Sequence, residues 1–256
     1  MRLTVLGCSG SVGGPGSACS GYLVAVDGQR PVLMDCGPGV LGELQSRVDP
    51  VDVDVMLSHL HADHCLDLPA MLVWRRYAPN PAGNRARLYG PSGTAVRVGA
   101  ASAEVAGEVD DISDTFDAVE WQDRVDVELH GLTVTPVRVN HPPETYGLRV
   151  TGPQGQVVAF SGDTGMCDEV VEVAEGADVF LCEATWTHAP DERPPNLHLS
   201  GYEAGQIATK AGVRSLALTH LAPWFDAEEI LAIGQFGMQD HIQKLLLQRN
   251  QKRAEF

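Results

Sequence analysis

The chain has 256 residues, of which 44% are hydrophobic and 20% charged, and this balance is that of an ordinary soluble globular protein. Its formal net charge of −16 disfavours non-specific attraction to nucleic acid, because such attraction depends on neutralising phosphates with Lys and Arg. No low-complexity tract or Gly/Ser linker divides the sequence, so we expect a single domain over residues 1–256.

The N-terminal residues and the cysteines indicate the compartment. The start of the chain lacks the pattern of a signal peptide, and no apolar run reaches the roughly 18 residues that a membrane span needs. We therefore expect a cytoplasmic protein without a membrane partner. No CxxC pair occurs, which predicts free thiols. The cysteines are Cys8, Cys19, Cys36, Cys65, Cys167 and Cys182.

The N-terminal half begins as a series of strands that leads into a polar cluster. Apolar runs at residues 2–7, 21–26 and 31–37 are separated by Gly and Pro, which predicts consecutive strands of an antiparallel sheet. Residues 51–58 form a further expected strand, and residues 65–78 have the apolar spacing of a helix. The stretch SHLHADHCLD therefore lies on a strand-to-helix loop.

Further strands and one well-marked helix follow. The charged segment at residues 108–123 has no strand pattern. The helix expected within residues 198–213 begins with a capping box formed by Ser200 and Glu203 and stops at Gly212. Strand-rich halves joined to helices predict an α/β (α+β) fold with four αββα layers. The strand-like segments lie within residues 86–91, 132–141, 146–152, 156–163, 178–186 and 215–224.

Histidines and aspartates gather at the expected strand ends. Imidazole and carboxylate at the spacing of SHLHADH are what a divalent first-row metal selects. His141, Asp163 and His220 each follow an apolar strand directly and precede turn residues. Neither solubility nor packing requires that coincidence, so we expect these loops to converge on one metal site. The candidate metal ligands are His59, His61, Asp63, His64, His141, Asp163 and His220.

The order and strand-end placement of these residues resemble the metallo-β-lactamase fold hydrolases, from about Met1 to Trp224. The resemblance implies a four-layer αββα sandwich with two zinc ions, although Mn²⁺ and Fe²⁺ accept the same ligand types. Two such metals lower the pKa of a water between them and so provide a hydroxide nucleophile. The implied ligands are His59, His61 and His141 for one ion and Asp63, His64 and His220 for the other, with Asp163 as the bridge.

The ligand set also resembles one branch of this fold more than others. The β-lactamase branch has Cys at the position of Asp163, and the oxygen-reducing diiron branch has an acid at the position of His61. The chain instead resembles ribonuclease Z-like phosphodiesterases, including the segments CEATW and HLS. This resemblance implies catalytic roles for Asp63, for His198 as the proton donor to the leaving oxygen, and for Glu183, which orients His198.

The segment between His141 and Asp163 bears on the substrate. Ribonuclease Z relatives that process transfer RNA carry a long RNA-gripping arm there, whereas this chain has only PPETYGLRVTGPQGQVVAFSG. The absence of this arm and the negative net charge of the chain favour a small phosphodiester over a large RNA as substrate. Segments including LGCSGSVGGPGS, GDTG and LTHLAPW resemble actinobacterial atypical class II cyclic-nucleotide phosphodiesterases, which implies hydrolysis of 3′,5′-cyclic AMP to the 5′-monophosphate.

Several alternatives stay open from the sequence. A ribonuclease Z-like nuclease for transfer RNA 3′ processing, or a lactonase or esterase, shares these ligands. A metal-binding scaffold without turnover is the least favoured hypothesis. Relatives are often dimers, so a homodimer is an expectation of the resemblance.

Two further features concern the tryptophans and the C-terminus. Trp74, Trp186 and Trp224 are candidates for stacking on a nucleobase, with core packing as the default. In place of the family's last strand, residues 233–256 have the pattern of a polar, locally basic helix or tail.

Overall fold

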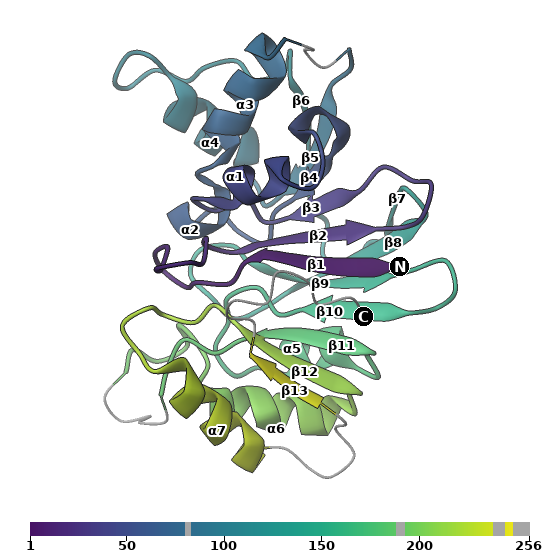
Figure 1. Cartoon of the computed structure of the whole chain (residues 1–256), viewed down its shortest axis with the longest axis vertical. Helices are drawn as coiled ribbons and strands as arrows, with labels where there is room; N and C mark the ends of the chain where they lie inside the picture. The colour runs from purple at the N-terminus through teal and green to yellow at the C-terminus, as the bar shows by residue number, and fades with distance from the viewer. Residues whose placement is uncertain (80–82, 188–192, 238–243, 248–256) are drawn as a thin grey trace.

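The computed structural model of the chain describes residues 1–79, 83–187, 193–237 and 244–247. Two β-sheets pack face to face, and helices cover the outer face of each, so the chain forms four layers (Figure 1). This arrangement confirms the predicted αββα sandwich. In the described part of the chain, no helix has the length and apolar content to cross a membrane.

The first sheet has six strands in the order β1-β2-β3-β4-β5-β6. As predicted for the N-terminal runs, β1, β2 and β3 pair antiparallel, whereas β3 to β6 pair parallel. The strands are β1 (Arg2–Gly7), β2 (Gly21–Ala25), β3 (Val32–Met34), β4 (Asp54–Met56), β5 (Ala86–Gly90) and β6 (Phe116–Glu120).

Strand β6 corrects the expectation that the charged segment 108–123 has no strand. It is an edge strand in which only Phe116 is buried and the next four residues are exposed. Charged side chains on an edge strand are compatible with pairing on its other side and discourage pairing with another chain. The alternation that marks a half-buried strand is therefore missing from its sequence.

The second sheet has seven strands in the order β13-β12-β11-β10-β9-β8-β7. Its strands β7 to β10 pair antiparallel, and β10 to β13 pair parallel. They are β7 (Val127–Leu129), β8 (Leu132–Arg138), β9 (Tyr146–Thr151), β10 (Val157–Phe160), β11 (Val179–Glu183), β12 (Ser215–Thr219) and β13 (Lys244–Leu247).

Strand β13 corrects the prediction of a helix or tail over residues 233–256. Lys244 to Leu247 pair parallel with Ser215 to Leu218 of β12, so a short last strand does close the second sheet. A run of three leucines between polar residues is too short for its periodicity to separate a strand from a helix. The rest of the segment, apart from the end of helix α7, lies outside the described residues.

The helices lie on the outer faces of the sheets. Helix α3 falls within the predicted 65–78, and α6 has the predicted capping box: the Ser200 hydroxyl accepts from the Glu203 N–H, and the Glu203 carboxylate accepts from the Ser200 N–H. Gly212, at φ 66°, ends α6 as predicted. The helices are α1 (Val40–Gln45), the 3₁₀ turn η1 (Pro50–Asp52), α2 (Ala62–Cys65), α3 (Leu68–Tyr77), α4 (Thr94–Ser102), α5 (Asp168–Ala174), α6 (Gly201–Ala211) and α7 (Ala227–Gly237).

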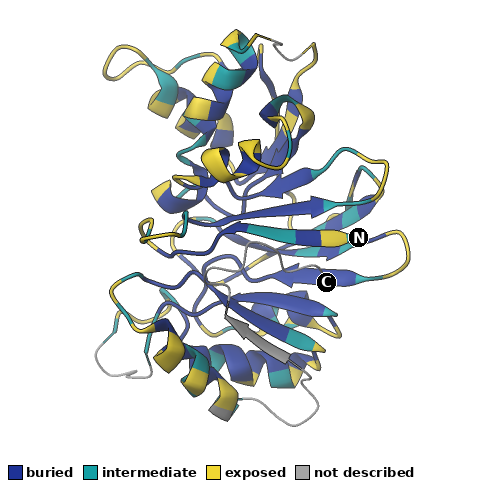
Figure 2. Cartoon of the chain, viewed as in Figure 1, coloured by how far each residue is buried: buried dark blue, intermediate teal, exposed yellow. Residues whose placement is uncertain are grey.

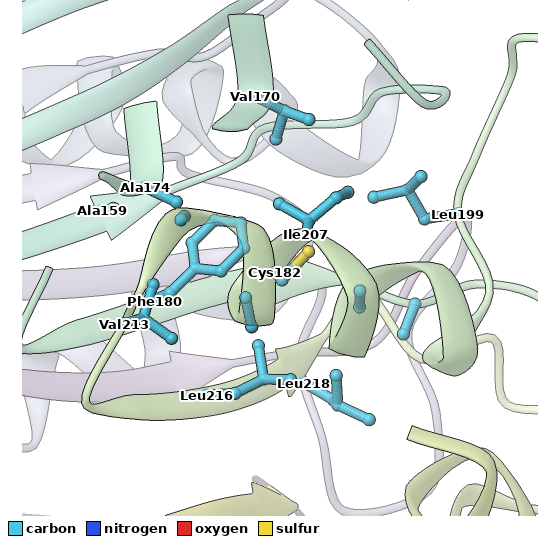
Figure 3. Close-up of a cluster of buried hydrophobic side chains, with 14 of the residues drawn as sticks. Ala159, Val170, Ala174, Phe180, Cys182, Leu199, Ile207, Val213, Leu216 and Leu218 are labelled. Carbon is cyan, nitrogen blue, oxygen red and sulfur yellow. The ribbon is translucent and has the colours of Figure 1, made fainter. Parts of the chain in front are cut away.

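Apolar side chains fill the spaces between the layers, and Figure 2 shows both sheets as mostly buried. Tyr22 of the first sheet meets Phe160 of the second with ring centroids 5.1 Å apart. Between the second sheet and its helices, Phe180 packs in one cluster with Val170 of α5 and Ile207 of α6 (Figure 3). Burying such a side chain stabilises the fold by about 1.5–3 kcal/mol.

The cysteines belong mostly to the core and form no disulfide in the described part of the chain. All six are free, and only Cys167 is not fully buried, as the sequence predicted. Burial raises the pKa of the Cys36 and Cys182 thiols well above the usual range, so these residues act as small apolar side chains.

Candidate metal centre

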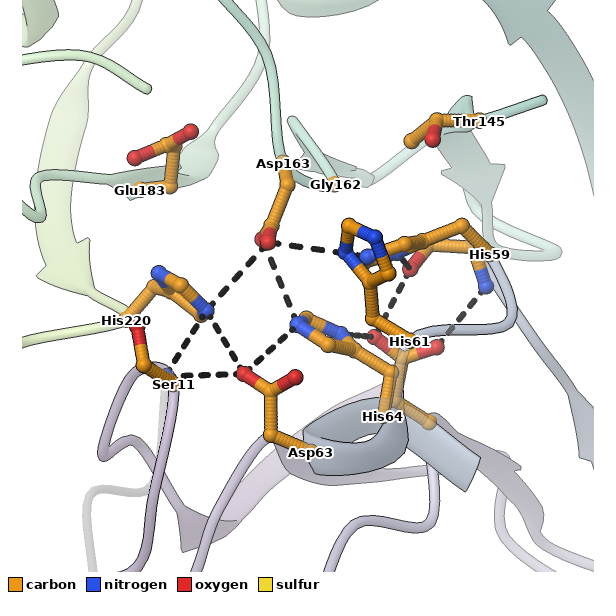
Figure 4. A network of polar contacts seen from close by, with 12 residues as sticks. Ser11, His59, His61, Asp63, His64, Thr145, Gly162, Asp163, Glu183 and His220 are labelled. Atoms are coloured by element: carbon orange, nitrogen blue, oxygen red, sulfur yellow. Dashed lines mark hydrogen bonds and ion pairs between the residues drawn. The ribbon is translucent and has the colours of Figure 1, made fainter. Parts of the chain in front are cut away.

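The seven predicted ligands meet at one edge of the paired sheets. His59 and His61 follow strand β4, and Asp63 and His64 lie on the short helix α2. His141, Asp163 and His220 follow strands β8, β10 and β12. Because these strands end at the same edge, side chains far apart in the sequence point toward one another (Figure 4).

The ligand atoms form two groups that share one carboxylate. In each group the atoms lie within 4.8 Å of one another. Asp163 belongs to both groups, which is the position of a bridging ligand. The first group is His59, His61, His141 and Asp163, and the second is Asp63, His64, Asp163 and His220.

Short distances connect the members of each group. In the second group, His220 Nε2 lies 3.0 Å from Asp63 Oδ2 and 3.3 Å from Asp163 Oδ2. His64 Nε2 lies 3.3 Å from the other oxygen of Asp163. In the first group, His61 Nδ1 lies 3.3 Å from His141 Nε2. Ring nitrogens and carboxylate oxygens this close converge on common points.

Four of the imidazoles are held by hydrogen bonds at Nδ1. His59 Nδ1 donates to Ser58 Oγ, and His64 Nδ1 donates to Asp35 Oδ2. His141 Nδ1 donates to Leu197 O, and His220 Nδ1 donates to Thr185 Oγ1. The four donor–acceptor distances are 2.7–3.1 Å. We assign the donor direction from the network, because Ser58 and Thr185 donate their own hydroxyl protons to carboxylates. A proton on Nδ1 leaves Nε2 with a lone pair for a cation.

The buried polar atoms of the cluster fit bound cations. Three buried atoms of the ligand cluster lack a hydrogen-bond partner among the described residues: His59 Nε2, His64 Nε2 and Asp163 Oδ1. Buried polar groups are normally satisfied, and leaving one unpaired costs about 1–3 kcal/mol. All three are predicted ligand atoms, and imidazole with carboxylate suits divalent ions such as Zn²⁺. The residues present therefore fit a divalent metal.

Most protonation states match this chemistry. Burial lowers the pKa of His59, His61 and His141, which keeps these rings neutral as ligands must be. Burial also lowers the pKa of His64, but Asp163 and Asp35 outweigh this effect and raise it well above the usual range, so a cation at His64 Nε2 would displace a proton. Burial alone would raise the pKa of Asp63, but the neighbouring His220 and His64 rings hold it well below its usual range. Burial would also raise the pKa of Asp163, but the neighbouring His220 and His64 outweigh this effect and hold the pKa well below its usual range. Both carboxylates are therefore ionised.

Comparison with known proteins decides the family. Residues 30–221 match the Beta-lactamase superfamily domain. The chain belongs to this family. It is 56% identical to the uncharacterised protein Rv1339 of Mycobacterium tuberculosis over 91% of this chain and 85% of that one.

Two further comparisons agree with this family. Ribonuclease Z of Thermobifida fusca is 29% identical over 89% of this chain and 86% of that one. The crystal structure of the metallo-β-lactamase fold protein YhfI of Bacillus subtilis superposes with a TM-score of 0.83 at 23% identity, covering 97% of this chain and 96% of that one. The chain is thus a metallo-β-lactamase fold hydrolase whose His/Asp clusters are able to bind metal.

A pair formed by the half-buried His198 and the buried Glu183 borders the metal ligands of this hydrolase. His198 Nδ1 donates to Glu183 Oε1 at 3.0 Å and lies 3.8 Å from Asp163 Oδ2. Glu183 is fully buried and also accepts from the Thr164 N–H and the Thr185 hydroxyl. Burial lowers the pKa of His198, but Glu183 outweighs this effect and raises it to about 9. His198 is therefore protonated on both nitrogens at neutral pH.

The loop that carries His198 is fixed on both sides. Arg193 forms two hydrogen bonds of 2.8 and 2.6 Å with the carboxylate of Glu203, the capping residue of α6. Asn196 packs against Gly165, where an added Cβ would lie only 2.7 Å from the Asn196 Cα. The Leu197 carbonyl holds His141. His198 is thus positioned relative to the metal ligands.

Among the groups that touch the ligands and were missed from the sequence are Asp35 and Ser11. Asp35, after β3, is fully buried at φ 58° and holds both the His64 ring and Ser58. Ser11, at φ 64°, donates its N–H to Asp63 Oδ2 at 2.8 Å. The strand-end criterion that selected Asp163 would also have selected Asp35 in LMDCG. No side-chain pattern could have indicated Ser11, because its contact is a backbone one.

Proposed function

We propose that this hydrolase is a dinuclear zinc phosphodiesterase that converts 3′,5′-cyclic nucleotides such as cyclic AMP to 5′-monophosphates. His59, His61 and His141 would hold one ion and Asp63, His64 and His220 the other, with Asp163 between them. Divalent ions bound there supply positive charge for the phosphoryl oxygens and lower the pKa of a water molecule.

The observation that carries the proposal is the His198–Glu183 pair beside Asp163. In the reaction a water oxygen bonds to phosphorus, the bond from phosphorus to the 3′ oxygen breaks, and that oxygen needs a proton. His198 can donate it from Nε2, because Glu183 occupies Nδ1 and the raised pKa keeps Nε2 protonated at neutral pH.

The size of the substrate is supported by the short connection between His141 and Asp163. Strands β9 and β10 occupy this interval, and a tight turn joins them, closed by a hydrogen bond from the Gly155 N–H to Gly152 O. The interval therefore holds no arm for gripping RNA. Together with the net charge of −16, this favours a small phosphodiester.

Turnover of cyclic AMP by the purified protein tests the proposal. We expect release of 5′-AMP that stops after treatment with chelator and returns when Zn²⁺ or Mn²⁺ is added, with two ions bound per chain at full activity. Release of 3′-AMP would refute the assigned bond cleavage. If protein that holds two ions does not hydrolyse cyclic nucleotides, the proposed substrate class is wrong.

A second candidate is a ribonuclease Z-like nuclease, which the 29% identity to ribonuclease Z of Thermobifida fusca favours. The two hypotheses differ in how precursor transfer RNA behaves in the assay. Precursor transfer RNA with a 3′ extension should be cleaved under this second hypothesis and should fail to inhibit cyclic-nucleotide hydrolysis under the first.

A further inference from the structure

Aromatic side chains follow the two strands that carry Glu183 and His220. Trp186 lies three residues beyond Glu183, at the end of β11, and Trp224 lies four residues beyond His220, after β12. Strands β11 and β12 are parallel neighbours, so the two loops start side by side. The Trp224 loop also approaches the turn next to Ser11, because an added Cβ on Gly14 would lie 3.1 Å from Pro223.

The rings form a continuous row that begins at the metal ligands. His198 stacks on His220, with centroids 5.1 Å apart. Trp186 meets His198 edge-on at 6.3 Å, and Phe225 meets Trp186 at 6.0 Å. Trp224 contacts Phe225 at 6.3 Å and ends the row. A row of aromatic side chains therefore leads from the proposed proton donor to the exposed Trp224.

The outer part of this row has features of a binding surface. Trp224 is 59% exposed, although indole is among the side chains that gain most from burial. The indole N–H of Trp186 is buried and has no hydrogen-bond partner among the described residues. Trp74, the third candidate from the sequence, instead donates to Asp49 next to the turn η1. Unlike Trp74, Trp224 has an exposed ring and Trp186 has an N–H donor that is unpaired within the described part of the chain.

We propose that Trp186, Phe225 and Trp224 form the subsite that binds the nucleobase of the substrate, with Trp224 as its open stacking face. This inference rests on the proposed function, since it specifies the part of a cyclic nucleotide that lies beyond the phosphate. Every base has a π-face, so stacking selects for a nucleobase without reading its edge. The subsite accordingly accepts both purines and pyrimidines and favours the larger purine ring.

Stacking on this surface contributes to binding before the reaction and throughout it. An interaction of equal strength in the ground state and the transition state changes KM and leaves kcat nearly constant. One stacked base typically changes binding about five- to 150-fold. We therefore expect Trp224→Ala to raise KM for cyclic AMP about tenfold with little change in kcat. Trp224→Phe keeps a ring and should restore most of the lost affinity.

A pair of ligands, one with the base and one without it, provides the test. Calorimetric titration of the metal-loaded protein with 5′-AMP and with ribose 5-phosphate measures the contribution of the base directly and needs no turnover. We expect 5′-AMP to bind at least about fivefold more tightly. The preference should disappear in Trp224→Ala and persist in Trp224→Phe. Tyr77→Ala is the matched control, because Tyr77 is a 74% exposed aromatic residue on helix α3.

The outcomes separate this inference from the proposed function. Equal binding of the two ligands, or an unchanged preference in Trp224→Ala, overturns the aromatic subsite even if cyclic AMP is hydrolysed. A preference that depends on Trp224, in a protein that does not hydrolyse cyclic AMP, supports the subsite and overturns only the proposed reaction. Loss of the preference in Tyr77→Ala would also count against the subsite.

Discussion

The two halves of the ligand cluster differ in charge and in the groups behind them. The half around His59, His61 and His141 has three imidazoles and shares the one carboxylate of Asp163. The half around His64 and His220 has two imidazoles, adds the carboxylate of Asp63 and shares Asp163. A third carboxylate, Asp35, lies behind His64, whereas the groups behind His59 and His141 are a hydroxyl and a carbonyl.

Under the proposed dinuclear function, this difference predicts that the two halves hold their cations unequally. A site with more carboxylates attracts a divalent ion more strongly, and a carboxylate behind a histidine makes that ring a better donor. His61, in the first half, is also the one ligand among the seven that is not fully buried. We therefore expect the half with Asp63 to bind its ion more tightly, and the half with His61 to lose its ion first during dialysis against chelator.

Substitution of the shared carboxylate should remove the difference and have the largest effect. Asp163→Ala withdraws a ligand from both halves and leaves His59 and His64 facing each other without a counter-charge. We expect metal content to fall below one ion per chain and hydrolysis to fall by at least about four orders of magnitude. Elemental analysis and turnover measure the two effects. An Asp163→Ala protein that retains two ions would contradict the bridging position.

Substitutions confined to one half should reveal the inequality. Asp63→Asn is expected to lower ion content to about one per chain at metal concentrations where His61→Asn still binds nearly two. Both should reduce turnover by about a thousandfold or more, because the charge of two ions is needed together. Far-ultraviolet circular dichroism should show an unchanged fold for each. If the two proteins lose metal equally, the proposed order of affinities is wrong.

Substitution of His198 should separate proton delivery from metal binding. His198→Gln keeps a side chain that can reach Glu183 but cannot donate a proton at neutral pH. We expect kcat to fall by about 10²–10⁴-fold, with the metal content of both halves unchanged. A substrate whose leaving group needs no proton, such as a 4-nitrophenyl phosphodiester, should be much less affected. Equal losses on both substrates would exclude the proton-donor role.

The groups behind the ligands should give the smallest effects. Asp35→Asn weakens the hold on His64 and is expected to lower the affinity of the second half about 10- to 100-fold. Ser58→Ala affects His59 and should weaken the first half by less, because a neutral hydroxyl is lost in place of a charge. Competition with a metal-binding dye measures both affinities. A larger loss of metal affinity in Ser58→Ala than in Asp35→Asn would contradict the expected difference between the two halves.

The sequence was sufficient for the fold and for the side chains that meet in the cluster. His141, Asp163 and His220 could be selected because each ends an apolar strand, and parallel strand ends meet at one edge. Helix α6 could be placed because its start and stop depend on local hydrogen bonds of Ser200 and Gly212.

What the sequence did not predict depends on contacts made between distant segments. Strand β6 keeps its charged side chains in solvent and exists because β5 offers backbone partners. Strand β13 is specified by the free edge of β12 more than by its own four residues. The N–H of Ser11 reaches Asp63 only after the glycine-rich loop has folded over α2. The exposure of Trp224 likewise follows from the loop that carries it.

The hydrogen bond between Tyr22 of the first sheet and Thr219 of the second lies next to His220, and it connects segments from opposite ends of the chain. Because the cluster uses both sheets, a chain in which only one sheet has formed holds no complete set of ligands. Metal uptake should therefore be a late event in folding, after slow long-range pairing. A metal ion present at 100 times its dissociation constant then adds about 2.7 kcal/mol to the free energy of unfolding, because it binds the complete fold and not the unfolded chain. Metal starvation would in this way lower the amount of folded protein as well as its activity.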